Sequence, residues 1–157
     1  MTEENRHEQL TEFMIEMKKA VEASGGRIQL PPPSTETLKT EYIDFEMGKS
    51  LTGRVKFDSR FTNPLFAFQG GFLAAAIDNV LGPLSYMAAQ KPASTIEMST
   101  SYIRPFLEKD EYIDIYGEVI SMTKTLLILR AEVKNKEGKL LATASQHALI
   151  VTPPSPV

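Results

Sequence analysis

The segment 71–89 constrains the fold of this chain more than any other. It is apolar on nearly every face of a helix, and Asp78 is its only charged residue. A helix that is apolar all round must be covered by the rest of the protein, so we expect a long central helix. Gly82-Pro83 interrupts the pattern. We expect Pro83 to bend or break the helix, because the proline ring clashes with the preceding turn.

The segments on either side of this helix have the two-residue period of β-strands. The sequence predicts six strands, over residues 41–47, 51–58, 95–104, 112–121, 125–134 and 139–151. In the first, Ile43, Phe45 and Met47 alternate with Tyr42, Asp44 and Glu46. Residues 135–138 form a hairpin signal that ends in glycine. These elements predict an α+β fold in which an antiparallel six-stranded sheet wraps around the helix.

An extra N-terminal helix is predicted over residues 5–23, where apolar side chains recur at spacings of three and four. We expect it to pack on the main body, and we expect Pro31-Pro32-Pro33 to form a stiff, extended connector. The predicted organisation is an N-terminal helix and connector (1–33), one domain (34–152) and a disordered tail (153–157).

Composition excludes several classes of function. The 157 residues contain no cysteine, which removes disulfides, thiolate nucleophiles and cysteine-based metal sites. Seventeen basic and twenty acidic residues give a net charge of −3, so nucleic acid is not an expected partner. The polar first ten residues do not resemble a secretory signal, and no apolar run suggests a membrane span. We expect a cytoplasmic protein with no membrane partner.

Asp78 is the residue that fits its surroundings least. A carboxylate on a buried helix is costly unless it is paired or hydrogen-bonded. A structural role would pair it with the backbone or with a buried arginine such as Arg104. A functional role would make it a nucleophile or a general base, because perturbed carboxylates concentrate at active sites.

Gly70-Gly71 stands where the loop 59–69 enters the central helix. Glycines at a helix start leave free N–H groups that can bind an anion or a developing oxyanion. Asp78 is seven residues past Gly71, on the same side of the helix and roughly 10 Å along it. Both groups cannot act on one carbonyl carbon at that distance. A shared reaction therefore predicts a dimer in which the glycines of one subunit meet Asp78 of another.

Several segments together resemble a known family. They are residues 63–71 with the following 72–78, the run 94–105, Glu118-Val119 and residues 138–142. This pattern is similar to the hot-dog-fold acyl-CoA thioesterases, in particular their PaaI-like branch, and it covers about residues 40–151. The resemblance implies a hot-dog fold, hydrolysis of a medium-chain or aryl acyl-CoA, no metal or redox cofactor, and a homodimer or a dimer of dimers.

The resemblance also implies roles for individual residues. Asp78 matches the catalytic carboxylate, acting as general base or nucleophile. Gly70 matches the backbone N–H that polarises the thioester carbonyl, with Gly71 beside it. Asn63 matches the residue that holds the loop and helps to place the acyl group or water. Thr95 matches a position across the subunit interface that helps to orient the water.

One residue departs from the family pattern, because Gln69 stands where relatives carry a histidine. Glutamine can form hydrogen bonds but cannot transfer a proton near neutral pH. One alternative is therefore a protein that binds acyl-CoA without hydrolysing it. A hot-dog dehydratase or hydratase is less favoured, since neither His7 nor His147 is placed for proton transfer. Five residues are candidates either for the lining of an acyl pocket or for the core: Phe66, Phe68, Phe72, Tyr86 and Met87.

Overall fold

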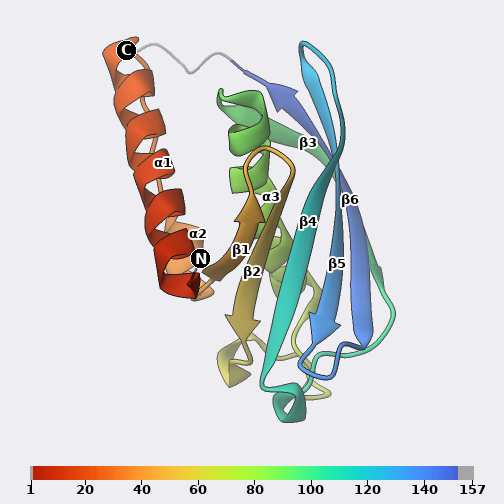
Figure 1. Ribbon diagram of the computed structural model, residues 1–157. Helices are drawn as coiled ribbons and strands as arrows, with labels where there is room; N and C mark the ends of the chain where they lie inside the picture. The colour runs from red at the N-terminus through yellow and green to blue at the C-terminus, as the bar shows by residue number, and fades with distance from the viewer. Residues whose placement is uncertain (1, 152–157) are drawn as a thin grey trace.

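The computed structural model describes residues 2–151, and Figure 1 shows a curved sheet with one long helix along its inner side. The helices are α1 (Glu3–Ala23), α2 (Pro33–Thr37) and α3 (Gly70–Ala89), with short 3-10 turns at Ser59–Phe61 and Glu108–Asp110. The strands are β1 (Glu41–Glu46), β2 (Ser50–Lys56), β3 (Ala93–Tyr102), β4 (Tyr112–Met122), β5 (Leu126–Asn135) and β6 (Leu140–Ile150). The two long helices and six strands predicted from the sequence are confirmed. The tail predicted at 153–157 lies outside the described residues.

The six strands form one sheet in the order β1-β2-β4-β5-β6-β3, and every neighbouring pair is antiparallel. β1 and β3 are therefore the two edges. The chain enters α3 after β2 and returns at β3 on the opposite edge, so the helix spans the concave side of the sheet (Figure 1). The expected α+β architecture, a sheet wrapped around a helix, is confirmed.

α3 lies so close to the sheet that two strand positions must be glycine. A Cβ atom on Gly53 of β2 would lie 2.5 Å from Val80 Cγ2, and one on Gly117 of β4 would lie 2.8 Å from Leu81 Cδ2. Both distances are shorter than real carbon contacts, so any larger residue would push the helix away. Val80 and Leu81 are completely buried. The apolar composition of α3 is thus explained by its place inside the sheet.

α1 packs against β1, the strand at one edge of the sheet. Leu10 and Met14 are buried in the same apolar cluster as the α3 and strand side chains. The connector after α1 differs from the expectation, because Pro33 begins the five-residue helix α2 instead of continuing an extended segment. Proline fits the first position of a helix, where its missing N–H has no partner to lose. The division of the chain at residue 33 stays a prediction.

The first strand does not keep the one regularly alternating buried face that the sequence predicted. The register of β1 on β2 shifts just after Tyr42, which marks a β-bulge. Because of the bulge, Tyr42 and Phe45 both pair with buried positions of β2, Gly53 and Leu51, although they are three residues apart. Tyr42 is buried, whereas Met47, which the alternation placed with Phe45, is exposed.

Pro83 does not break α3, which continues through it as one helix. Proline has no N–H to donate to the carbonyl four residues earlier, which belongs to Asn79. The Tyr42 hydroxyl donates to this Asn79 carbonyl over 2.7 Å. The Asn79 side chain is also bound, since Ser34 Oγ donates to Oδ1 (2.8 Å) and Nδ2 donates to Thr40 Oγ1 (3.3 Å). A buried side-chain hydroxyl thus replaces the backbone donor that proline lacks.

By length and composition alone, α3 is apolar enough to cross a membrane, and it is the one such helix in residues 2–151. This corrects the expectation that no apolar run comes close to a membrane span. An 18-residue stretch of α3 is 56% buried inside the fold. Its contacts with the sheet account for its apolar character.

Tyr42→Phe removes the donor to the Asn79 carbonyl and is expected to lower the free energy of unfolding by about 1–3 kcal/mol. Pro83→Ala restores a helical N–H at position 83, so the cost of Tyr42→Phe should be smaller in that background. Chemical denaturation of the four proteins measures this coupling. Equal costs in the two backgrounds would show that the hydroxyl does not replace the missing donor.

Stability is also expected to fall at alkaline pH because of Tyr42. Burial raises the pKa of Tyr42 from 10.0 to about 12. The unfolded chain therefore loses this proton at a lower pH than the folded protein does. The contribution of Tyr42 to the free energy of unfolding is complete below pH 10. It declines by about 2–3 kcal/mol in all as the pH rises toward 12. Denaturation curves across this range should show a steeper decline for the wild type than for Tyr42→Phe, and parallel declines would contradict the assignment.

Candidate active site

Asp78 lies on the least buried face of α3, beside β3 and β6. Its side chain is exposed in the single chain, which corrects the expectation of a buried carboxylate. Thr95 Oγ1 of β3 donates to Asp78 Oδ1 over 3.1 Å, and Gln146 Nε2 of β6 donates to the same oxygen over 2.7 Å. We refer to Asp78, Thr95 and Gln146 as the carboxylate cluster.

The partners of Asp78 differ from those expected. Thr95 reaches Asp78 within the same chain, so no second subunit is needed to bring these two residues together. Arg104 was the candidate ion-pair partner, but it is exposed and its Nη1 donates to the Leu140 carbonyl over 2.8 Å. The carboxylate is therefore held by neutral donors.

Gln146 is the member of the carboxylate cluster that the sequence analysis missed. Its side chain is 1% exposed and points toward α3 from an inward position of β6. The other inward positions around it are the buried alanines Ala142, Ala144 and Ala148. A single amide in an otherwise apolar strand face is the sequence signal that identifies it, because buried polar groups need partners.

Tyr86 is a titratable neighbour of the carboxylate cluster, and the charge of Asp78 affects its pKa. Burial raises the pKa of Tyr86, and the negative charge of Asp78 raises it further, so this half-buried hydroxyl stays protonated at neutral pH.

Neither histidine is part of the carboxylate cluster. His147 Nδ1 lies 3.3 Å from Glu97 Oε2, and both residues are on the β6 and β3 positions that face away from Gln146. His7 is an exposed residue of α1.

The second group of predicted residues lies at the start of α3. Gly70 and Gly71 are the first two residues of the helix, and its first recorded backbone bond runs from the Leu73 N–H to the Gln69 carbonyl (3.0 Å). Among the hydrogen bonds of residues 2–151, none uses the N–H of Gly70 or of Gly71. These two amides are therefore available to a carbonyl oxygen or an oxyanion.

Tyr102, at the end of β3, fixes this helix start. Its hydroxyl donates to the Gly70 carbonyl over 2.7 Å. A Cβ atom on Gly70 would lie 3.1 Å from the Tyr102 ring, whereas one on Gly71 would meet nothing within 4 Å. The approach of Tyr102 thus leaves little space for a larger side chain at position 70, a restriction that only the structure reveals.

Asn63 folds the loop that leads into α3. Its Oδ1 accepts from the N–H groups of Leu65 (2.9 Å) and Ala67 (3.2 Å), and its own N–H donates to the Ala67 carbonyl (2.8 Å). A role for Asn63 in placing a ligand stays a prediction. Gln69 is the N-cap residue of α3; its side chain is exposed and makes no capping hydrogen bond.

The structure does not bring the two groups together within one chain. Gly70 and Asp78 are eight residues apart on a continuous helix, which separates them by about 12 Å. The six predicted site residues therefore fall into two sets, with Asn63, Gln69, Gly70 and Gly71 at the helix start and Asp78 and Thr95 about two turns along the helix.

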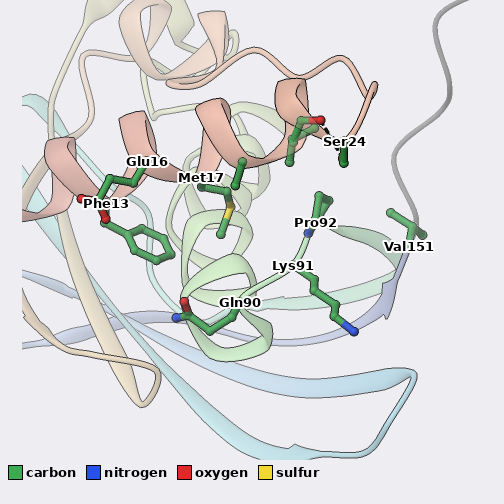
Figure 2. Close-up of a pocket in the computed structure, with 10 residues that line it drawn as sticks. Phe13, Glu16, Met17, Ser24, Gln90, Lys91, Pro92 and Val151 are labelled. Atoms are coloured by element: carbon green, nitrogen blue, oxygen red, sulfur yellow. Dashed lines mark hydrogen bonds between the residues drawn. The ribbon is translucent and has the colours of Figure 1, made fainter.

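A groove of about 480 Å³ lies elsewhere, between α1 and the link from α3 to β3 (Figure 2). Phe13 and Met17 form its α1 side, and Lys91 and Pro92 form the opposite side (Figure 2). None of the six predicted residues lines it. The groove is at the C-terminal end of α3, away from the glycines at the helix start.

Four of the five residues proposed for an acyl pocket divide into two kinds, and the fifth, Tyr86, is half-buried. Phe68 and Met87 are buried in the core, which settles their structural role. Phe66 is 80% exposed, and Phe72 is 37% exposed, with its ring 4.7 Å from that of Phe61. Leu65 is 82% exposed. Leu65, Phe66 and Phe72 are therefore exposed apolar side chains in the loop before α3 and in its first turn.

Within residues 2–151 no group of three or more histidine, cysteine, aspartate or glutamate side chains is arranged to hold a metal ion. The expectation that the protein needs no cofactor stays a prediction.

Comparison with known proteins extends this description. Residues 69–142 match the family model of the thioesterase superfamily. No curated protein sequence matches the chain significantly. Many solved structures do share its fold.

Three of these structures show the extent of the likeness. The PaaI protein from the phenylacetic acid degradation operon of E. coli is 13% identical, with a TM-score of 0.74 over 94% of this chain and 99% of that one. A phenylacetic acid degradation-related protein from Ralstonia eutropha is 22% identical, with a TM-score of 0.69 over 85% and 98%. A thioesterase from Haemophilus influenzae is 13% identical, with a TM-score of 0.71 over 78% and 85%. At these identities the likeness establishes the fold.

Proposed function

We propose that this chain, which belongs to the thioesterase superfamily through residues 69–142 and has the hot-dog fold of the PaaI-like proteins, hydrolyses acyl-CoA thioesters. Superfamily membership supports thioester hydrolysis as the class of reaction. The acyl-CoA substrate rests on the resemblance of its motifs and on the geometry of the two residue groups described above.

The two groups have complementary chemistry. The Gly70 N–H would polarise the thioester carbonyl, and Asp78 would either take a proton from the attacking water or attack the carbonyl carbon itself. In the first case the water oxygen bonds to the acyl carbon, the water proton passes to Asp78, the carbon–sulfur bond breaks, and the CoA thiolate leaves and takes up that proton. In the second case an Asp78 oxygen bonds to the acyl carbon as the carbon–sulfur bond breaks, and water then hydrolyses the resulting anhydride to the free acid and the Asp78 carboxylate. Thiolates are good leaving groups, so no strong acid is needed.

The single observation that carries the proposal is the way β3 links the two groups. At one end of β3, Thr95 contacts Asp78, and at the other end Tyr102 contacts Gly70. Within residues 2–151 the outer edge of β3 is not paired with any strand. Exposed strand edges favour pairing with another chain.

Pairing of β3 with its own copy would complete the site. In an antiparallel pair related by a two-fold axis, the Thr95 end of one strand lies beside the Tyr102 end of the other. Gly70 of the partner subunit is thereby brought toward Asp78. We therefore propose a homodimer with two shared sites, which also permits a dimer of dimers.

We also propose a medium-chain or aryl acyl group. Leu65, Phe66 and Phe72 are exposed apolar side chains in the loop before α3 and in its first turn, close in the chain to the amides where the thioester carbonyl would bind. Similarity to proteins of phenylacetic acid degradation supports an aryl group. Short, polar acyl groups would leave this surface in water and gain little from it.

The purified protein is expected to release free CoA from medium-chain or aryl acyl-CoAs, as measured with a thiol-reactive dye over a panel of short, medium, long and aryl substrates. Asp78→Asn should keep the fold and reduce kcat by about 100-fold or more, because a general base contributes on the order of 10² to 10⁴ in rate. Turnover that is unchanged in Asp78→Asn would remove this residue from the mechanism.

The same panel separates an enzyme from a binding protein, the alternative suggested by Gln69. Absence of turnover on every substrate, together with a raised melting temperature in the presence of acyl-CoA, would identify a protein that binds without hydrolysis. Gln69→His should leave kcat equal or higher if glutamine only replaces a positioning residue. The Gln69 side chain is exposed and makes no capping hydrogen bond, so a histidine can be accommodated at this position.

Shared sites predict that two inactive variants restore each other. Gly70→Pro removes the N–H at the first helical position, where proline is tolerated, and the preceding Gln69 is already extended (ψ 137°). Co-expression of Gly70→Pro with Asp78→Asn should recover roughly a quarter of wild-type activity, because half of the dimers are mixed and each has one intact site.

Two controls interpret this experiment. Gly70→Ala places a Cβ atom against Tyr102, as Gly70→Pro does, but keeps the Gly70 N–H, so it should retain most activity. A chain that carries both Gly70→Pro and Asp78→Asn, co-expressed with the Asp78→Asn chain, forms no intact site and should stay inactive. If native mass spectrometry confirms mixed dimers that are nevertheless inactive, the shared site is wrong.

A further inference from the structure

We propose that Gln146 is a positioning residue that decides which oxygen of Asp78 faces the substrate. This role rests on the proposed thioesterase function and concerns the same site. Gln146 would not touch the substrate. It would act by holding Asp78 Oδ1, so that Oδ2 is left as the reacting oxygen.

The hydrogen bonds of the carboxylate cluster are one-sided. Asp78 Oδ1 receives both Gln146 Nε2 (2.7 Å) and Thr95 Oγ1 (3.1 Å). Gln146 Nε2 also contacts Thr95 Oγ1, which closes the cluster into a ring of three side chains. Among the hydrogen bonds of residues 2–151, none uses Asp78 Oδ2. The two oxygens of the carboxylate are therefore not equivalent.

The orientation of the Gln146 amide follows from its neighbour. A carboxylate only accepts hydrogen bonds, so the Nε2 group must face Asp78; the reverse orientation would oppose two acceptors. This choice leaves the Gln146 Oε1 buried, with no hydrogen-bond partner in the described part of the chain.

An unpaired buried carbonyl is unfavourable for stability. The surrounding inward positions of β6 are alanines, and an apolar side chain in place of Gln146 would be compatible with them. Folding alone thus gives no reason for an amide here. The contact with Asp78 supplies one, because it fixes the carboxylate rotamer on a helix face that is otherwise open to solvent.

Thr95 and Gln146 have different parts in this arrangement. Thr95 is exposed, so water can take over its bond to Asp78 when the hydroxyl is lost. Gln146 approaches from the buried side, beneath the carboxylate, where water has little access. Only Gln146 therefore provides a fixed point that solvent cannot replace, and a reacting group needs such fixed support.

The test is the variant Gln146→Met, which keeps the length of the side chain and removes its polar atoms. With the best substrate of the acyl-CoA panel we expect kcat to fall by about tenfold to hundredfold, the range known for residues that orient metal ligands in the same indirect way. KM should stay unchanged, because Gln146 does not contact the substrate. The melting temperature should be equal or higher, because the unpaired carbonyl is removed.

The Asp78→Asn background separates positioning from a structural role. If Gln146 acts through the Asp78 carboxylate, Gln146→Met should add no further loss to Asp78→Asn. Ser145→Ala is the matched control, since Ser145 is the adjacent β6 residue, is exposed, and should leave kcat unchanged.

The outcomes distinguish the two proposals. An active wild type with unchanged kcat in Gln146→Met would overturn the role of Gln146 and leave the proposed function standing. A lower melting temperature, or a loss that adds to that of Asp78→Asn, would show a structural role and would also overturn it. Absence of turnover in the wild type would overturn the proposed function and this role with it.

Discussion

The close approach of α3 to the sheet is the constraint on which the rest of the structure depends. Gly53 and Gly117 leave space for Val80 and Leu81, and any side chain at either glycine would force the helix outward. The fit sets both the depth and the rotation of α3. Asp78 is about 200° around the helix axis from Val80, so burying Val80 turns Asp78 toward the open side. The position of the candidate carboxylate is thus a consequence of core packing.

Two buried polar side chains, Tyr42 and Gln146, affect stability in opposite ways. The hydroxyl of Tyr42 completes the hydrogen bonding of a helix that contains Pro83, and it serves stability. Gln146 leaves a buried group unsatisfied, because its Nε2 donates to Asp78 while its own carbonyl lacks a partner in the described chain. Natural proteins satisfy nearly all buried polar groups, and the exceptions call for an explanation. Here the proposed explanation is the support of a reacting carboxylate.

β3 connects the architecture with the proposed chemistry. It lies at the edge of the sheet, and the residues at its two ends contact the two halves of the candidate site. One continuous helix keeps those halves about 12 Å apart in a single chain. In the proposed dimer the antiparallel pairing of two such strands cancels this separation. The edge strand would then set the distance between the reacting groups as well as hold the subunits together.

Much of this protein was predictable from the sequence, because periodicity and composition report burial. The uniformly apolar segment 71–89 indicated the central helix, and the two-residue period indicated all six strands. Asp78 stood out as the only charge in that segment, and Gly70-Gly71 marked the helix start. Such local patterns do not report bulges or distant hydrogen bonds, however. The inward turn of Tyr42 depends on a shifted register, and the carbonyl that Pro83 leaves without a backbone donor accepts from Tyr42, which is 41 residues earlier in the chain than Pro83.

The candidate site divides in the same way. The sequence by itself determined which residue types are present and how far apart they lie along one helix, since helical rise is a fixed quantity. Only the tertiary structure decided that Asp78 is exposed, that Thr95 reaches it within the chain, and that Gln146 lies beneath it. These contacts join residues 17 and 68 positions apart in the chain. They arise from the packing of a helix across strands, and no periodicity along the chain encodes which strand residue will meet which helix residue.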